Sequence, residues 1–384
     1  MSFRQLLEKY QQNTATAAER EQVEAELEKY AALTEYLLEE EFQPKMEEDT
    51  AAEQEELQKI NRSLKWRTRR IVMAAALLAC LVMGVVLVFE STWSKWIWYD
   101  PTEAAMQEYA LDLDCHLAVL SELTMPEVQA EQVSVTERGW GRYDIAVRQR
   151  DWSEGDYHWL DGTVMRGEIA LHTDAYRPAV GNVFSRGTAE MTSIPEKGGV
   201  IQDVATAQEA LADVPDTLFL ETYVSLAQDW SMAELADFAD AVGSETGWLG
   251  WVGVRHAPLE EQCLPLMGFD AGSSGYIYDQ VDEAYPFYEL SLHADTPQDT
   301  AWEQHFYALL QYSVDHSDFY TRLNQMGNHG TKCRQVLDYV TRNGVQTYGF
   351  VYYGTPSDIR KILAYPEVEG ICVSDCRAWV PGLS

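Results

Sequence analysis

The sequence predicts a small all-α head, one transmembrane helix, and a larger α+β or α/β domain in which helices pack against a sheet. Three observations predict these parts. Residues 1–70 lack glycine and have helical apolar spacing, residues 71–89 contain no charged side chain, and the rest of the chain mixes strand-like with helix-like segments. The 384 residues suffice for two or more domains, and the ordinary apolar and charged fractions argue against wholesale disorder.

The head, residues 1–70, favours helix almost throughout, because Pro44 is its only proline and it has no glycine. Thr16-Ala-Ala-Glu19 is a capping box that opens a second helix. A third helical stretch, residues 51–70, runs on towards the membrane segment. Apolar stripes lie on the first two helices: Phe3, Leu6, Leu7 and Tyr10 on the first, and Val23, Leu27, Tyr30, Leu33 and Leu37 on the second.

Helices this short bury little surface, so their stripes indicate a partner protein; a self-contained hairpin or a homodimeric coiled coil is the alternative. Residues 1–58 carry five basic and sixteen acidic side chains, a net charge of −11. This charge complements a basic protein surface, such as one that otherwise meets DNA. The candidate partner-binding residues are Phe3, Leu6, Leu7, Tyr10, Val23, Leu27, Tyr30 and Leu37.

The run Ile71–Phe89 is apolar without interruption. Nineteen helical residues at about 1.5 Å each span roughly 28 Å, close to the roughly 30 Å of a bilayer core. A buried soluble helix of this length would carry a polar side chain on some face. A cleavable signal peptide fits poorly, because about seventy residues precede the run and no cleavage site follows it. We therefore expect a transmembrane helix.

The charges beside this run predict its orientation. Five basic residues precede it (Arg62, Lys65, Arg67, Arg69 and Arg70), whereas only Lys95 lies close behind it. The positive-inside rule then places the N-terminus in the cytoplasm and the C-terminal domain outside the cell membrane, with Trp93, Trp96, Trp98 and Tyr99 at the outer interface. A nucleic-acid or specific lipid site is the alternative for the basic run. The overall charge of −34 argues against nucleic acid as a direct ligand.

Beyond the span we expect three regions. Residues 90–130 form a stalk with a helical run at 102–123, and residues 131–210 form a β-rich subdomain. Residues 211–384 form an α/β domain. In the β-rich part, Val133–Thr136, Tyr143–Arg150 and Met165–Leu171 have strand-like composition.

The third region mixes strands with capped helices. Ser231-Met-Ala-Glu234 and Thr355-Pro356-Ser-Asp358 are helix starts, and Asn343-Gly344 is a helix stop. The helix from Ser231 buries Met232, Leu235, Phe238 and Val242. The expected strands are 218–226, 247–254, 346–353 and 370–373, and the other expected helices are 299–326 and 332–343.

Chemistry-bearing motifs are absent from the sequence. It contains no HExxH, GxSxG, Walker A or dinucleotide loop, so we expect neither an enzyme nor a cofactor. His329, Cys333, Cys372 and Cys376 have zinc-ligand side chains, but Cys333 lies on an apolar helix face, so no metal site is predicted. The disulfide state of Cys115, Cys263, Cys333, Cys372 and Cys376 stays open. So does the choice between core and ligand groove for five tryptophans: Trp140, Trp152, Trp159, Trp248 and Trp251.

A helical head, a basic doublet, one span and a large outer domain resemble the membrane-bound anti-sigma factors of Gram-positive bacteria. SLKWRTRRIVMAAALLACLVMGVVLVF is similar to the sigma factor regulator N-terminal segment. Residues 216–379 resemble the sigma factor regulator C-terminal domain through DTLFLETYVSLAQDWSMAELADFADAV, GWLGWVGV and GVQTYGFVYYGTPSDIRKILAYPEVEGICVSD. These segments cover about half the chain.

The resemblance implies that the head sequesters an extracytoplasmic-function sigma factor under control of the outer domain, and that proteolysis releases it in many members. Many members also bind zinc through His-x3-Cys-x2-Cys. Here Glu26, Tyr30 and Leu33 occupy that register, so a zinc switch is excluded in the head. The alternatives are a signal-anchored ligand-binding or hydrolytic domain whose head only dimerises, and a structural envelope protein. The outer signal, a processing protease and the oligomeric state stay open.

Overall fold

The computed structural model describes residues 9–11, 15–39, 51–89, 94–104, 111–126, 128–151, 157–172, 183–185, 200–243, 246–258, 264–272, 283–324 and 326–378. The chain divides into two compact units, residues 1–83 and residues 84–384. Each unit has its own local architecture.

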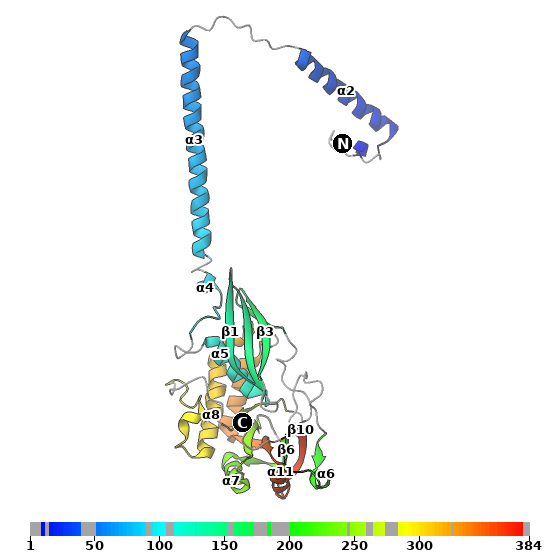
Figure 1. Cartoon of the computed structure of the whole chain (residues 1–384), viewed down its shortest axis with the longest axis vertical. Coiled ribbons are helices and arrows are strands. Elements are labelled where there is room, and N and C mark those ends of the chain that lie inside the picture. The colour runs from blue at the N-terminus through cyan, green and yellow to red at the C-terminus, as the bar shows by residue number, and fades with distance from the viewer. Residues whose placement is uncertain are drawn as a thin grey trace. The chain divides into compact units, whose positions relative to one another are not determined.

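Among its described residues, the N-terminal unit contains helical residues at 9–11, α2 (Ala17–Glu39) and the greater part of α3 (Ala51–Val88). Figure 1 shows α3 as one continuous helix. It joins the predicted stretch 51–70 to the predicted span without a break. The segment Asn61–Val88 is long and apolar enough to cross a membrane, and none of it is buried by the protein. Large apolar side chains such as Ile71 and Leu77 are exposed on its surface, as expected of a helix in contact with lipid.

The C-terminal unit begins with a short helix, α4 (Ser94–Ile97), and then α5 (Asp112–Thr124). The sequence predicts a stalk here, but α5 is a core helix. Leu113, Leu117 and Leu120 pack in the core under a small sheet. Cys115 and Val119 pack in a second, larger core. Both faces of α5 are therefore covered, because its apolar residues occupy two sides of the helix rather than one stripe.

The small sheet is an antiparallel meander of β1 (Val128–Gly139), β2 (Arg142–Asp151), β3 (Tyr157–Met165) and β4 (Glu168–Leu171). The predicted strand Met165–Leu171 is wrong in one respect, since the chain reverses inside it. Arg166 and Gly167 both have positive φ, at 52° and 89°, which is the geometry of a two-residue hairpin turn. Arginine is not a typical residue for that position, so composition alone did not indicate the turn.

The larger sheet has six strands in the order β5-β10-β6-β9-β7-β8. All its strand pairs are antiparallel, so the fold is α+β and not a parallel α/β arrangement. The strands are β5 (Gln202–Asp203), β6 (Leu218–Ser231), β7 (Trp248–Val254), β8 (Gly268–Asp270), β9 (Gln346–Gly354) and β10 (Val368–Ala378).

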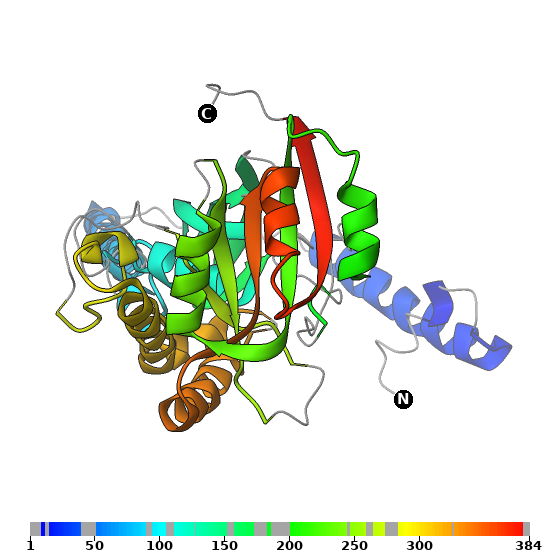
Figure 2. The same ribbon diagram turned by 90° about the horizontal axis from the view of Figure 1, so that it is seen from below.

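Helices cover one face of this sheet. Figure 2 shows α6 (Val204–Leu211), α7 (Met232–Val242) and α11 (Pro356–Ile362) lying along it. Alternation within β9 explains the two-sided packing: Phe350 and Tyr352 join the helix-covered core, whereas Val351 and Tyr353 join a third cluster on the opposite face. The remaining helices are η3 (Leu290–His293), α8 (Gln298–Asp315), α9 (Ser317–Arg322) and α10 (His329–Asn343).

The predicted helix boundaries are largely confirmed. Ser231 and Glu234 form the expected capping box, and α7 buries the four side chains named for it: Met232, Leu235, Phe238 and Val242. α10 ends at Gly344, whose φ is 81°. The predicted long helix 299–326 is instead two helices, because α8 ends at His316, whose Nδ1 lies 2.9 Å from the Tyr312 carbonyl oxygen.

Candidate functional site

The second helix of the head begins at the predicted capping box. The Glu19 carboxylate accepts the Thr16 backbone N–H at 2.9 Å, and the Glu19 N–H donates to the Thr16 hydroxyl at 3.4 Å. These hydrogen bonds, together with Lys9 at 3.0 Å, lower the pKa of Glu19 to about 2. The start of α2 is therefore set by its own residues.

The predicted partner-binding stripe separates into a buried and an exposed portion. Val23 is fully buried, whereas Leu27 and Tyr30 are 45% and 61% exposed. The Tyr10 hydroxyl donates to the Glu24 carboxylate at 3.1 Å, so Tyr10 lies against α2 next to the residue that follows Val23. Phe3, Leu6 and Leu7 lie outside the described residues, as does the side chain of Leu37. Val23 thus serves the head's own packing, and Leu27 and Tyr30 present apolar surface outwards.

The basic cluster lies on α3, next to the apolar segment. Arg62, Lys65, Arg67, Arg69 and Arg70 are all exposed. The Arg70 guanidinium lies over the Trp66 ring at 3.3 Å from its centroid. Because α3 is continuous, these cations sit within about two and a half helical turns of the apolar run.

The C-terminal unit contains a pocket of about 450 Å³ at the start of β7. Two of the five predicted tryptophans, Trp248 and Trp251, line it. Trp140 and Trp159 are exposed on the small sheet instead, and Trp152 lies outside the described residues. Lining residues that the sequence did not indicate include Asp240, Asp270, Trp302 and Tyr353.

A buried ionic cluster lies beneath this pocket. The Glu122 carboxylate at the end of α5 lies 2.7 Å from Nε2 of His305 on α8, and both side chains are almost fully buried. The same carboxylate oxygen accepts the backbone N–H of Asp270 at 3.2 Å. The Trp251 indole N–H donates to the Glu122 carbonyl oxygen at 2.7 Å. α5 is thereby tied directly to two pocket-lining residues.

The protonation state of His305 follows from its neighbours. Nδ1 lies 2.8 Å from the Phe287 carbonyl oxygen, so both ring nitrogens face acceptors. Burial alone would lower the pKa of His305, but attraction to Glu122 and the two hydrogen bonds outweigh burial and raise it. The imidazolium therefore pairs with the Glu122 carboxylate.

Asp270, at the end of β8, lies next to the same Glu122 carboxylate, but as a second acid it is repelled by that charge. Burial and the nearby Glu122 charge raise the pKa of the Asp270 carboxyl to about 6, although its Oδ1 accepts the Gly272 N–H at 2.9 Å.

One pattern in the sequence indicates this buried cluster. Trp302, His305, Phe306 and Leu309 recur at helical spacing and share one helix face, which predicts that His305 is buried with its apolar neighbours.

The four zinc-type side chains do not come together. The His329 Nε2 and Cys333 Sγ atoms lie 3.3 Å apart. Burial raises the pKa of Cys333 to about 12, and burial together with Lys332 lowers that of His329 to about 3, so the pair is neutral. Cys372 belongs to the third cluster, on the other face of the sheet, and Cys376 is exposed. No disulfide joins Cys115, Cys333, Cys372 and Cys376 to one another, and Cys263 lies outside the described residues.

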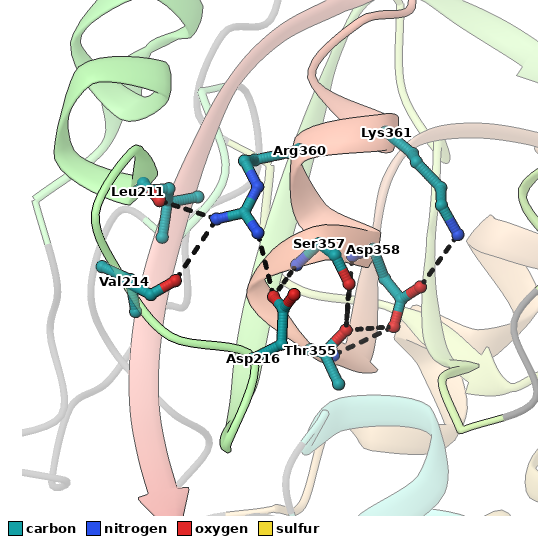
Figure 3. Close-up of polar contacts among 8 residues, drawn as sticks. All are labelled: Leu211, Val214, Asp216, Thr355, Ser357, Asp358, Arg360 and Lys361. Carbon is teal, nitrogen blue, oxygen red and sulfur yellow. Dashed lines mark hydrogen bonds and ion pairs between the residues drawn. The ribbon is translucent and has the colours of Figure 1, made fainter.

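A polar network anchors the start of α11 (Figure 3). Thr355 caps the helix through Asp358, and Pro356 occupies its first turn, as predicted. The Asp216 carboxylate accepts the Ser357 N–H at 2.8 Å and the Arg360 Nη2 at 2.9 Å. The same guanidinium donates to the Leu211 and Val214 carbonyl oxygens, so it holds the chain between α6 and β6 against α11.

Residues 211–374 match the family described as sigma factor regulator C-terminal. The matched region runs from the end of α6 into β10 and includes four of the six strands in full. It contains the α11 network and all the pocket-lining residues except Pro126. No curated protein and no solved structure matches the chain. The predicted resemblance over residues 216–379 is confirmed within five residues at each end, whereas the one predicted for the N-terminal segment stays a prediction.

Proposed function

By its C-terminal domain the chain belongs to the sigma factor regulator family, and on this premise we propose that it is a single-pass membrane anti-sigma factor. The observation that carries the proposal is the combination, in one chain, of this domain with a helix that is long and apolar enough to cross a membrane. The family implies a sigma factor as the protein partner, and an extracytoplasmic-function sigma factor is the partner we propose. The protein is then a regulator without catalytic activity of its own.

The proposed sigma-binding surface centres on Leu27 and Tyr30. These are the large apolar side chains of α2 that the structure describes as exposed, and exposed apolar surface on an otherwise charged helix marks a contact site. The acidic charge around them suits a partner whose surface is basic for contact with nucleic acid. With no His or Cys in residues 1–58, the head must act through packing and charge rather than through a bound metal.

The proposed topology places the head in the cytoplasm and the C-terminal domain outside. Its support is the asymmetry of charge, since five exposed cations precede the apolar run on α3. A reporter enzyme fused after Trp98 tests it. We expect activity from a reporter that works only outside the cytoplasm, and activity from a cytoplasm-only reporter would contradict the orientation.

Co-purification of the full chain with its sigma factor tests the binding surface. We expect Leu27→Glu and Tyr30→Glu each to weaken retention of the sigma factor by at least about tenfold, because each places a charge in an apolar contact. Ala25→Glu is the matched control: it adds the same charge to the opposite, exposed face of α2. Equal retention by Leu27→Glu and wild type would show that the surface is assigned wrongly.

A signal-anchored ligand-binding domain is the second candidate, and the pocket at the start of β7 favours it. It predicts ligand binding by the C-terminal unit and no cytoplasmic partner. Retention of a sigma factor by the full chain therefore supports the anti-sigma role, and its absence supports the ligand-binding domain.

A further inference from the structure

The pocket at the start of β7 is a site for which the proposed anti-sigma role gives no occupant. Its walls come from six parts of the C-terminal unit: the turn after α5, α7, β7, β9, the end of β8, and the first turns of α8. A volume of about 450 Å³ lies within the range of small-molecule sites.

Aromatic rings form its apolar wall. The rings of Trp248 and Tyr353 are stacked, with centroids 5.2 Å apart and planes inclined by 24°. The Phe219 ring lies beside Trp248 as well, at 5.2 Å between centroids, and Trp248 remains 40% exposed. Trp302 is held by its indole N–H, which donates to the Ala271 carbonyl oxygen at 3.0 Å. These rings are fixed before any ligand arrives, which lowers the entropic cost of binding.

The charged side chains that line the pocket are both negative. They are Asp240, in the last turn of α7, and Asp270, and no Lys, Arg or His is among the described lining residues. The negative end of the α7 dipole adds to them. The positive end of the α8 dipole, at Gln298, opposes them, but its roughly half a charge is smaller than two carboxylates. The pocket is therefore electrostatically suited to a cation.

The Asp270 carboxylate is oriented for such a contact. The Gly272 N–H holds its Oδ1, and its own backbone N–H is held by Glu122. The charged groups that act on it are Glu122 on α5, His305 on α8 and Arg150 on β2. His305 and Arg150 favour the ionised form of the Asp270 carboxyl, the form that a cation contacts, and neither of them lines the pocket. Aromatic faces beside such a carboxylate form the arrangement that attracts organic cations.

We propose that this pocket binds an organic cation, an ammonium or guanidinium group on an apolar carbon body. The charge lies between Asp240 and Asp270, and the carbon body lies against the Trp248–Tyr353 stack. A free small molecule and a side chain of a cationic peptide share this chemistry. The site concerns residues 240–353 and stands or fails independently of sigma-factor binding by the head.

The test uses the full-length chain in a non-ionic detergent and titration calorimetry. The probes are choline, its uncharged isostere 3,3-dimethyl-1-butanol, and the acetylated peptide amide Leu-Lys-Leu. We expect saturable binding of choline, of the peptide, or of both, and affinity for the uncharged isostere weaker by at least about tenfold. Tighter binding of choline identifies a free cation as the source, and tighter binding of the peptide identifies a side chain. Absence of binding by both cations, or equal binding of choline and its isostere, would overturn the proposal.

Variants assign the binding to the pocket. Asp270→Asn keeps the acceptor for the Gly272 N–H but removes the charge, and we expect at least about tenfold weaker binding of the cation that binds wild type. Trp248→Leu, which removes one ring of the stack, is the second variant and should also weaken binding. Asp237→Asn is the matched control, because Asp237 is an exposed α7 residue outside the pocket. Unchanged affinity in both pocket variants, each with a wild-type melting temperature or higher, would exclude this site.

Discussion

At the scale of single residues, the buried Glu122–His305 pair is the most consequential interaction in the C-terminal unit. It joins α5 to α8 through a 2.7 Å contact in a region closed to water. Burying two charges gains little over an apolar pair, but removing one partner leaves the other charge unpaired. The pair therefore constrains how α5 and α8 pack, whatever its net contribution to stability.

We expect Glu122→Gln to lower the free energy of unfolding by about 3 to 5 kcal/mol near pH 6, because His305 then loses its counter-charge. Unfolding of the full chain by urea, followed by tryptophan fluorescence, measures this. The contribution of a histidine with a raised pKa is present below its unfolded value of 6.5 and is lost as the pH rises through the folded value. The difference from wild type should accordingly narrow as the pH rises through the raised pKa of His305. Asp144→Asn, which breaks an exposed pair with Arg138, should cost less than about 1 kcal/mol.

The contribution of Asp270 changes with pH in the same direction as that of His305, but its cause is burial of the carboxyl rather than an ion pair. Its pKa is raised from 3.8 to about 6, so the folded protein holds this proton more tightly than the unfolded chain. The resulting stability is present below about pH 4 and is lost as the pH rises to about 6. We expect Asp270→Asn to be more stable than wild type by about 1 to 2 kcal/mol at pH 7.5, with no gain at about pH 4. An equal gain at both pH values would show that the carboxyl is not the cause.

At the scale of elements, the helix starts were predictable because their signals are local. A Ser or Thr followed three residues later by Glu or Asp satisfies the first orphan N–H groups wherever the helix lies. Four residues therefore suffice to predict each of the capping boxes of α2, α7 and α11. The interiors of β6, β7 and β9 followed from their composition, since both faces of the sheet are covered.

Pairing and packing were not predictable in the same way. The strand order of the larger sheet places β10 beside β6, which lies more than a hundred residues earlier in the chain. Nothing in the composition of β10 selects that neighbour. The pocket was only partly predicted for the same reason: Trp248 and Trp251 were named, but Trp302 and Asp270 come from distant segments. The sequence does not distinguish α5 from a stalk helix, because a helix buried on two faces has no single apolar stripe.

The α7 capping box offers a direct test at this scale. The Ser231 hydroxyl accepts the Glu234 N–H at 3.3 Å, and the Glu234 carboxylate accepts the Ser231 N–H at 2.7 Å. We expect Ser231→Ala to destabilise the C-terminal unit by about 1 kcal/mol, measured by urea unfolding. Ser231→Asn keeps a side-chain acceptor and should recover most of the loss. If the two variants unfold alike, the hydroxyl is not acting as the cap.

At the scale of the whole molecule, α3 is the covalent link between the two units. It carries the exposed basic cluster and the apolar run as one helix over Ala51–Val88. In the proposed topology a head with few basic groups meets the sigma factor on one side of the membrane. The domain that carries the family match and the pocket lies on the other side.

Site-specific photo-crosslinking in the full chain tests whether the exposed surface of α2 contacts a sigma factor. A photoreactive amino acid replaces Leu27 in one variant and Ala25, on the opposite face of α2, in another. Crosslinked proteins from the protein's own cells are identified by mass spectrometry. We expect a sigma factor joined at position 27 and little or none at position 25. Crosslinks at position 27 that contain no sigma factor, under conditions in which the chain is present in the membrane, would contradict it.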